Sequence, residues 1–445
     1  MSDRGNTKAQ SKATLSRRQM VAVASLPLLG GLPIERFAHA VGGSDTLKIG
    51  LIGCGNRGGG AAFQALKADR NTRLVAMGDV FPDQLETCLT KLRDRAGNQV
   101  SVARDRRFVG LDACRHVAEL SDVVILATPP GFRPDHFSDA IEGGCHVFME
   151  KPLAVDGPGV RKILETALLA DEKSLKVGVG FQRRHQVAYI ETIKRLQDGA
   201  IGKLLSARTY TNVGGMREPR VTRADVDSEL DYQLRNWSYY NWLGGDPITE
   251  QHVQNLDVIN WLKGGFPVMA RGMGGREVRS DAKYGDIYDH HCVEYQYADG
   301  SWMVGQCRQI RGCWNSTSEH VQGAFGRSDI SRFQIESRNG SWSYRRRKSD
   351  LNPFQQEHND LFAAIRGDRP YNEAYTGAKT SLSAIMGRMA SYSGGQVNWD
   401  QVLNSDLQMM PTDLSLEAQL PRQLDENGSY PIPVPGDELW QQRIV

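Results

Sequence analysis

One stretch near the start of the chain decides the fold: LKIGLIGCGNRGGG, residues 47–60. Its first six residues are mostly apolar and predict a strand, and the small residues at its end predict the start of a helix. Between them stands the pattern Gly53-Cys54-Gly55-Asn56-Arg57-Gly58. A GxGxxG pattern is weak alone, but between a strand and a helix it is typical of a turn that binds a dinucleotide.

Each glycine of this pattern has a physical role in such a turn. Gly53 allows the tight turn, Gly55 lets the backbone approach a pyrophosphate, and Gly58 lets the helix and the strand pack closely. The N–H groups at the helix N-terminus then bind the phosphates. We therefore predict a dinucleotide site that includes Asn56 and Arg57. The alternative is a flavodoxin-like turn that holds no dinucleotide.

An acidic residue follows at roughly the distance that a dinucleotide site requires. The second predicted strand, 73–79, ends in Asp79, 26 positions after Gly53. A carboxylate at this place accepts hydrogen bonds from the adenosine ribose, and its charge would repel a 2′-phosphate. The predicted cofactor is therefore NAD, with NADP disfavoured. The alternative for Asp79 is a cap of the helix that begins near Pro82.

Apolar runs alternate with helical patterns as far as residue 181, which predicts βαβ units with a parallel sheet. The predicted strands of this part are 47–52, 73–79, 122–128, 146–149 and 176–181. Later strands look antiparallel, with a hairpin turn at 298–300; they are 204–213, 291–297 and 302–310. The predicted class is α/β: a Rossmann domain at 46–175 and a C-terminal α/β domain with a mainly antiparallel open sheet at 176–400. Residues 401–445 are expected to wrap the surface as a tail.

The first 40 residues have the order of an export signal. A polar start is followed by Ser16-Arg17-Arg18-Gln19-Met20, a weakly apolar run at 21–29 and Ala38-His39-Ala40. The paired arginines resemble a twin-arginine (Tat) signal, although Met20 replaces the usual phenylalanine and the customary lysine is missing. We expect residues 1–40 to direct export to the periplasm and to leave no membrane anchor in the mature chain. The alternative is a disordered basic leader.

Charge and cysteine usage exclude several classes of partner. The chain has 54 basic and 52 acidic side chains, a formal net charge of +2, which argues against a nucleic-acid binder that works by bulk charge. Its seven cysteines are an odd number without CxxC spacing, so neither a disulfide framework nor a metal site is predicted. The expected partner is a small molecule.

Two further motifs stand at the ends of predicted strands, Thr128-Pro129-Pro130 after the fourth and Glu150-Lys151-Pro152 after the fifth. Together with the glycine loop, they resemble the Gfo/Idh/MocA family of NAD(P)-dependent oxidoreductases over residues 46–400. The resemblance implies a Rossmann domain, a second domain whose sheet often forms homodimers or homotetramers, and a sugar or polyol bound between the domains. It also implies that both motifs contact the cofactor and that Lys151 assists deprotonation of the substrate hydroxyl. The alternative for Lys151 is a surface lysine in a salt bridge.

A second segment, 242–257, also matches the family pattern, which is a glycine pair, an acid, a histidine four residues on and an aspartate three beyond. Glu250, Gln254 and Asp257 fall on these places. The spacing i, i+4, i+7 predicts that all three lie on one helical face and line the substrate pocket.

Gln254 departs from the family pattern, because the family commonly has its catalytic acid/base histidine there. Glutamine can hydrogen-bond a hydroxyl but cannot exchange a proton near neutral pH. Either Lys151 carries the proton transfer alone, or Gln254 marks a changed or reduced activity. His252 is two residues from Gln254 and would point about 200° away from it around the helix, so it is a poor substitute. The alternative for His252 is a core or supporting histidine.

Polar and aromatic residues elsewhere fit a sugar pocket. Gln182, Arg183 and His185 follow the sixth predicted strand, at the edge where α/β sheets bind ligands. Trp237 lies in a segment that interleaves aromatic and amide groups, which suits stacking on a sugar. The alternatives are a solvated basic loop for the first group and a core or subunit contact for Trp237.

These features predict an exported oxidoreductase that acts on a sugar or polyol hydroxyl with tightly bound NAD. Two alternatives stay open at this point. One is a redox-neutral NAD-dependent glycosidase, and the other is a non-catalytic NAD-bound protein that binds sugars.

Overall fold

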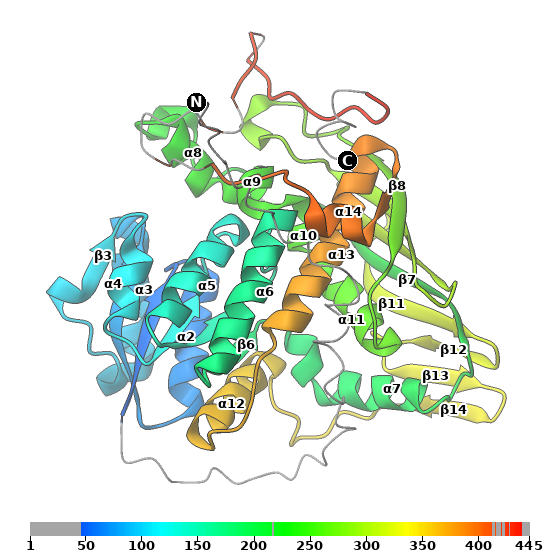
Figure 1. Cartoon of the computed structure of the whole chain (residues 1–445), viewed down its shortest axis with the longest axis horizontal. Coiled ribbons are helices and arrows are strands. Elements are labelled where there is room, and N and C mark those ends of the chain that lie inside the picture. The colour runs from blue at the N-terminus through cyan, green and yellow to red at the C-terminus, as the bar shows by residue number, and fades with distance from the viewer. Residues whose placement is uncertain are drawn as a thin grey trace, which may run out of the picture. The chain divides into compact units, whose positions relative to one another are not determined.

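The computed structural model of the chain describes residues 46–215, 218–411, 414, 420, 423–426 and 428–437 (Figure 1). The predicted signal at 1–40 lies outside these residues, as do parts of the predicted tail at 401–445. None of the described helices combines the length and apolar character that crossing a membrane requires.

Six parallel strands form the first sheet, in the order β3-β2-β1-β4-β5-β6. Their bounds are β1 (Leu47–Ile52), β2 (Thr72–Asp79), β3 (Arg107–Val109), β4 (Val123–Leu126), β5 (His146–Met149) and β6 (Val177–Val179). This is the strand order of a dinucleotide-binding Rossmann fold, so the predicted fold is confirmed. The order reverses between β1 and β4, and this leaves a crevice at the carboxyl end of β1, where the glycine loop begins.

The strand β6 belongs to this parallel sheet, because it pairs in parallel with β5. The sheet therefore extends past residue 175, where the sequence placed the domain boundary. The physical reason is that α6 (Gly157–Glu172) is a crossover helix, and a crossover helix returns the chain to the sheet that it left. The second domain begins after β6.

Helices pack against the parallel sheet and bury its apolar strands. They are α2 (Asn56–Ala68), α3 (Pro82–Ala96), α4 (Ala113–Ala118), α5 (Arg133–Glu142) and α6. Ile49 and Leu51 of β1 share one core with Ala62 and Leu66 of α2. Short 3-10 helices lie in the connections: η1 (Gly97–Gln99), η2 (Arg104–Arg106), η3 (Pro130–Phe132), η4 (Gln182–His185), η5 (Arg223–Asp225), η6 (Trp237–Tyr239) and η7 (Ala282–Tyr284).

The second sheet has nine strands in the order β14-β13-β12-β11-β7-β10-β9-β8-β15. Their bounds are β7 (Leu204–Val213), β8 (Met269–Gly275), β9 (His290–Gln296), β10 (Trp302–Gln309), β11 (Ser316–Gly323), β12 (Gly326–Asp329), β13 (Gln334–Ser337), β14 (Gly340–Ser343) and β15 (Gln396–Asn398). Only β7 and β10 pair in parallel among these strands, so the sheet is mainly antiparallel, as predicted. The predicted turn between β9 and β10 is present, with Gly300 at a φ of 80°.

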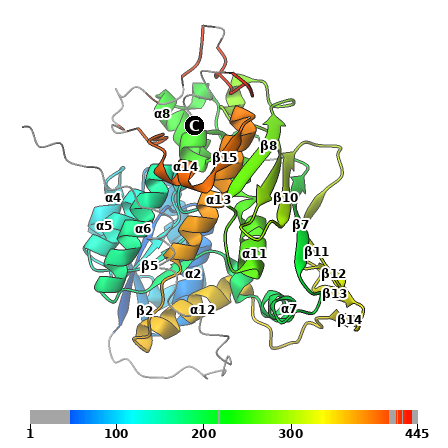
Figure 2. The same ribbon diagram turned by 45° about the vertical axis from the view of Figure 1, so that its right-hand side comes forward.

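Helices of the second domain lie between the two sheets and beside them (Figure 2). They are α7 (Val187–Gln197), α8 (Glu229–Arg235), α9 (Asn241–Gly244), α10 (Asp246–Glu250), α11 (Val253–Lys263), α13 (Ala374–Ser393) and α14 (Trp399–Asn404). Helix α13 packs against α6 on one side and β8 on the other, and it is buried along almost its whole length. It therefore packs between α6 of the first domain and the second sheet.

Helix α12 (Pro353–Arg366) follows the second sheet in the chain but packs on the first domain. Its N-cap is Asn352, whose side chain accepts a hydrogen bond from the Phe354 N–H. Leu361 and Phe362 lie in the core that α2 and β1 form. The Rossmann core is therefore completed by a helix about 300 residues away in the chain.

This packing predicts that Leu361→Ala destabilises the protein by about 2–5 kcal/mol, because the side chain is fully buried and its removal leaves a cavity. Urea unfolding measures the loss. Leu205→Ala is the matched control: Leu205 lies half exposed on β7, and its loss should change the free energy of unfolding by less than about 0.5 kcal/mol. Equal losses for the two variants would contradict the packing of α12.

Candidate active site

The glycine loop has the geometry that a bound dinucleotide needs. Gly53 has a φ of 88°, and a Cβ there would lie 2.6 Å from the Ala127 backbone. A Cβ on Gly58 would lie 1.8 Å from the Gly53 carbonyl oxygen, so both positions require glycine. A Cβ on Gly55, in contrast, would meet no described atom within 4 Å. The absence of a side chain at Gly55 leaves open space beside the start of α2, and this fits the pyrophosphate of NAD.

Asp79 lies directly beside this loop. One oxygen accepts a hydrogen bond from the Cys54 N–H at 2.6 Å, and the other accepts one from the Phe81 N–H at 2.9 Å. Burial raises the pKa of Asp79 above its ordinary value, although the backbone donors oppose this shift. Asp79 is thus fixed between the glycine loop and the start of α3. This position suits the predicted ribose contact. Asp79 also accepts the hydrogen bond from Phe81, the residue just before α3.

Arg57 binds two carboxylates. Its Nε lies 2.5 Å from Oε1 of Glu150, and its Nη2 lies 3.0 Å from Oε1 of Glu357 on α12. The sequence predicts Arg57 and Glu150 as cofactor residues but gives no sign that they form an ion pair. Glu357 was not identified from the sequence, because it reaches this place only through the packing of α12. The three side chains tie the glycine loop to the end of β5.

Glu357 is an almost fully buried acid. Its Oε2 has no hydrogen-bond partner among the described residues. Burial, and then the nearby charge of Glu150, raise the pKa of Glu357 well above its ordinary value, while Arg57 and His185 oppose this shift. The carboxyl therefore keeps its proton to a higher pH in the folded chain than in the unfolded chain.

A buried arginine holds the motif at the end of β4, Thr128-Pro129-Pro130. Arg133 donates to the carbonyl oxygens of Leu126 at 2.6 Å and Thr128 at 2.7 Å. Burial lowers the pKa of Arg133 to about 10. The Thr128 hydroxyl also bonds the ring of His136 at 3.0 Å. The hydrogen bonds from Arg133 thus fix the backbone at the carboxyl end of β4, beside the crevice of the sheet.

Lys151 and Glu250 meet where the two domains join. The Lys151 Nζ donates to the carbonyl oxygen of Glu250 at 2.5 Å and lies 3.3 Å from its Oε1. The two side chains are 14% and 24% exposed, so both remain partly accessible. The structure therefore brings together the predicted base and a carboxylate that can exchange a proton with it.

The prediction of one helical face for Glu250, Gln254 and Asp257 is wrong. Helix α10 ends at Glu250 and α11 begins only at Val253, so Glu250 lies on a different helix from the other two. Gln254 still lies near the site, since its Nε2 donates to Oε1 of Gln182 at 2.9 Å.

Asp257 already has partners for both carboxylate oxygens. They bind Arg184 at 2.7 and 2.9 Å, and one also accepts from the Thr380 hydroxyl at 2.9 Å. The side chain is almost fully buried. This pairing favours a structural role for Asp257 over the predicted substrate contact.

His252 is a core residue, the alternative that the sequence left open. Its ring nitrogens bond the hydroxyls of Thr209 at 3.0 Å and Thr211 at 2.8 Å. Burial lowers the pKa of His252 to about 3, so the ring is neutral in the folded protein. It cannot replace the missing catalytic histidine.

Two predicted substrate residues form ion pairs with carboxylates of the protein. Arg183 lies 2.5 Å from Glu319, and His185 lies between Asp360 at 2.7 Å and Glu373 at 3.2 Å. Burial alone would lower the pKa of His185, but the two carboxylates raise it to about 10. Both cations are thus held by the protein itself, which leaves Gln182 as the best placed substrate residue of this group.

Trp237 is half-buried and packs against an apolar cluster rather than standing free. The cluster includes Tyr232, Tyr239 and Trp242 of its own segment, and Phe132 of the first domain. These contacts favour the alternative for Trp237, a core contact, over the predicted sugar stacking.

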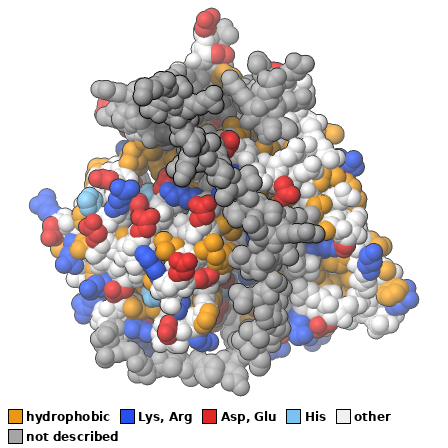
Figure 3. Space-filling view, viewed as in Figure 1, with side chains coloured by type: hydrophobic (Ala, Val, Ile, Leu, Met, Phe, Trp, Pro, Cys, Tyr) orange, Lys and Arg blue, Asp and Glu red, His pale blue; other side chains and the backbone are white. Residues whose placement is uncertain are grey.

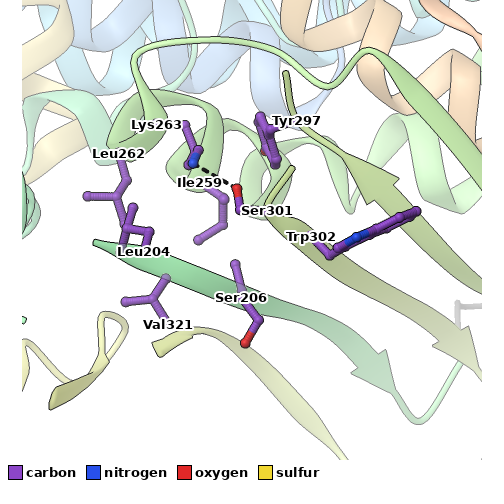
Figure 4. A pocket seen from close by; sticks show the side chains of 10 residues that line it. Leu204, Ser206, Ile259, Leu262, Lys263, Tyr297, Ser301, Trp302 and Val321 are labelled. Atoms are coloured by element: carbon purple, nitrogen blue, oxygen red, sulfur yellow. Dashed lines mark hydrogen bonds between the residues drawn. The ribbon is translucent and has the colours of Figure 1, made fainter. Parts of the chain in front are cut away.

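A small pocket lies beside the end of α11, where Ile259, Leu262 and Lys263 line it (Figure 4). Gln254 stands at the start of the same helix. Its volume is about 10 Å³, close to the smallest space that holds one water molecule. Lys263 reaches across it and donates to the Ser301 hydroxyl at 2.8 Å. A sugar does not fit this space. Its lining residues are Leu204, Ser206, Ala207, Ile259, Leu262, Lys263, Tyr297, Ser301, Trp302 and Val321.

Comparison with known families gives one match, at the first domain. Residues 47–181 match the model of the Gfo/Idh/MocA oxidoreductase family, described as an NAD-binding Rossmann fold. The chain is 28% identical to an inositol 2-dehydrogenase of Rhizobium meliloti over 58% of this chain and 68% of that protein. It is 32% identical to inositol 2-dehydrogenase 4 of Saccharopolyspora erythraea over 47% of this chain and 57% of that protein.

Two solved structures are similar in fold. An aldose-aldose oxidoreductase from Caulobacter crescentus, complexed with glycerol, has a TM-score of 0.63 at 18% identity, covering 79% of this chain and 99% of that one. A scyllo-inositol dehydrogenase from Lactobacillus casei, with bound NAD(H) and scyllo-inositol, has a TM-score of 0.59 at 20% identity, covering 80% of this chain and 99% of that one. At these identities the likeness shows the fold alone.

The buried acid of this site predicts a pH-dependent effect of Glu357→Gln. Because the folded pKa of Glu357 is raised, the wild type loses stability as the pH rises from about 4.3, the unfolded value, towards the folded pKa. The glutamine variant lacks this loss. Its free energy of unfolding relative to wild type should therefore increase by about 1 kcal/mol or more between about pH 5 and pH 8.

Urea unfolding at the two pH values measures this difference. Glu86→Gln is the control, since Glu86 is a mostly exposed acid paired with Arg107. Its difference from wild type should stay constant. If Glu357→Gln also gave a constant difference, Glu357 would not be held in its protonated form.

Proposed function

Because this chain carries the NAD-binding Rossmann domain of the Gfo/Idh/MocA oxidoreductase family, we propose that it oxidises a hydroxyl of a sugar or polyol. The observation that carries the proposal is the contact of Lys151 with Glu250 at the carboxyl end of β5. Ligands of open α/β sheets bind at this edge. The similarity to two inositol 2-dehydrogenases supports a polyhydroxylated substrate.

The glycine loop and Asp79 would hold NAD, which would supply the acceptor for the hydride that leaves the substrate carbon. The hydroxyl proton of the substrate must leave at the same time. Lys151, in its neutral form, accepts this proton at Nζ and becomes an ammonium. The carbonyl oxygen of Glu250 orients Nζ through a hydrogen bond of 2.5 Å. The substrate C–H and O–H bonds break, and a carbonyl group forms.

Glu250 completes the route of the proton. Its Oε1 lies 3.3 Å from the Lys151 Nζ, and the partly exposed carboxylate can pass a proton on to solvent. Gln254 stands where the resemblance to the family implies a histidine, and its amide donates to Gln182. An amide does not exchange protons near neutral pH, so the proton route uses Glu250 in place of that histidine.

We further propose that the protein is exported and keeps its NAD bound. The twin-arginine pattern of residues 16–20 supports export of a folded chain with its cofactor. Outside the cytoplasm, no soluble pool would reoxidise NADH. The bound cofactor would then be reoxidised by a second substrate, such as another sugar whose carbonyl is reduced.

Gln254 also supports a second candidate function, an NAD-bound protein that binds sugars without turning them over. Product analysis separates the candidates. Purified protein is extracted for bound nucleotide and ligand, identified by mass spectrometry, and is then incubated with inositols and aldoses, alone and in pairs. Oxidised product supports the oxidoreductase. Sugar binding by calorimetry without any product supports the binding protein, and release of nitrophenol from nitrophenyl glycosides would support a glycosidase instead.

The proton route predicts unequal effects of two substitutions. Lys151→Met should lower kcat by about 10²–10⁴-fold, because it removes the proton acceptor, while NADH binding is retained. Glu250→Gln should lower kcat less, because it removes the carboxylate that passes the proton on but leaves the proton acceptor Lys151 in place. Steady-state kinetics over a range of pH check both expectations.

Lys263→Met is the matched control, since Lys263 is a similarly buried lysine, 12% exposed, that pairs with Asp299 at the far end of α11. It should leave kcat near the wild-type value. A Lys151→Met variant as active as Lys263→Met would remove Lys151 from the mechanism.

A further inference from the structure

One segment of the second domain contacts both loops that flank the cofactor crevice. The segment is residues 218–245, which carry η5, α8, η6 and α9 and stand between β7 and α10. We call it the cofactor cover. The loops that it contacts follow β2 and β4, and both lie at the carboxyl edge of the parallel sheet, where the dinucleotide binds.

At the loop after β2, the cover makes a charged and an aromatic contact. The guanidinium of Arg235 lies 3.9 Å from the centre of the Phe81 ring, and its Nη1 lies 3.5 Å from Oδ1 of Asp83. Asp231 holds the same guanidinium from within α8 at 2.8 Å. Since Phe81 donates its N–H to Asp79, these contacts act two residues away from the predicted ribose ligand.

At the loop after β4, the contact is apolar and close. The ring of Phe132, at the end of η3, meets the ring of Trp242 edge-on at 6.4 Å. A Cβ on Gly131 would lie 2.3 Å from the carbonyl oxygen of Trp242, so the two backbones touch. Phe132 belongs to the same apolar cluster as Leu230 of α8, and Phe81 packs against that cluster.

The cover is itself firmly packed. Trp242 is fully buried, and its Nε1 donates to Oε1 of Gln233 at 2.8 Å. Asn241 bonds Asp286, through its N–H at 2.9 Å, and the Tyr392 hydroxyl at 2.9 Å. Lifting the cover would therefore break several buried contacts at once, which makes opening slow compared with the fluctuation of an exposed loop.

We propose that the cofactor cover retains NAD, so that the dinucleotide leaves only when the contacts of Arg235 and Trp242 with the first domain are broken. This proposal rests on the bound-cofactor part of the proposed function. It assigns to the cover a role in cofactor release, separate from the chemical step at Lys151. Arg235 is a positioning residue, because it touches the loop beside the ribose ligand and takes no part in the reaction.

The test measures how fast bound NADH leaves the full-length holoprotein. NADH is bound first, excess NAD is added, and the loss of protein-bound NADH fluorescence is followed with time. Arg235→Ala should release NADH at least about tenfold faster than wild type, because it removes the ring contact and the ion pair together. Its kcat with a pair of sugars, of which the second reoxidises the bound cofactor without release, should change by less than about twofold, as expected when a contact outside the chemical step is removed.

Two further variants complete the experiment. Arg195→Ala is the matched control: Arg195 lies 4.3 Å over the Trp342 ring and pairs with Glu191, far from the cofactor crevice, and its loss should leave the release rate unchanged. Phe81→Leu keeps the apolar volume but removes the contact between guanidinium and ring. It should also speed release, and it tests the proposal if Arg235→Ala does not fold.

The outcomes test the cofactor cover and the proposed activity separately. Equal release rates for wild type, Arg235→Ala and Phe81→Leu overturn the proposal that the cofactor cover retains NAD. Faster release from both variants, with no turnover of any sugar by wild type, supports the cover and overturns the proposed activity. Failure of wild type to bind NADH at any concentration overturns both.

Discussion

The contact of Lys151 with Glu250 depends on one buried cation that joins two distant segments. Arg388 of α13 donates to the carbonyl oxygen of Val155 at 2.6 Å and to that of Gly245 at 3.1 Å. Val155 follows Lys151 in the chain, and Gly245 precedes the helix that ends at Glu250. Both segments are thus fixed to one side chain that is itself almost fully surrounded by protein, and the distance between Lys151 and Glu250 is set by packing rather than by loop conformation.

Most charged groups near this contact are already paired, which limits the groups that remain for chemistry. Arg57 holds Glu150 and Glu357, and His185 lies between two carboxylates. Burying a charge without a partner is costly, and these pairs supply partners where α12 packs on the first domain. Acidic and basic side chains are also interspersed on the face shown in Figure 3. Lys151, the Glu250 carboxylate and the amide pair of Gln182 and Gln254 are partly exposed, and none of them lies in these ion pairs with Arg57 and His185.

The sequence predicted the parts of the site that local spacing determines. The glycine loop, the parallel sheet and the mainly antiparallel second sheet are confirmed, because a strand, a turn and a helix are each encoded within a few residues. The partners of Arg57 and His185 were not predicted, because Glu357 and Asp360 come from α12 and reach the site only through tertiary packing. The helix break after Glu250 was not predicted either, because a spacing of four residues cannot show where one helix ends and the next begins.

The break between the helices that carry Glu250 and Gln254 affects the surroundings of Lys151. If Gln254 stood on one helix with Glu250, both would face the substrate and Glu250 would be one more hydroxyl ligand. The break between α10 and α11 instead lets Glu250 approach Lys151 with its backbone carbonyl and its carboxylate together. A lysine held by a carbonyl oxygen and next to a partly exposed carboxylate has both a fixed orientation and a route for its proton. The replacement of histidine by glutamine is therefore compatible with turnover in this chain, because the geometry around Lys151 already contains another proton acceptor.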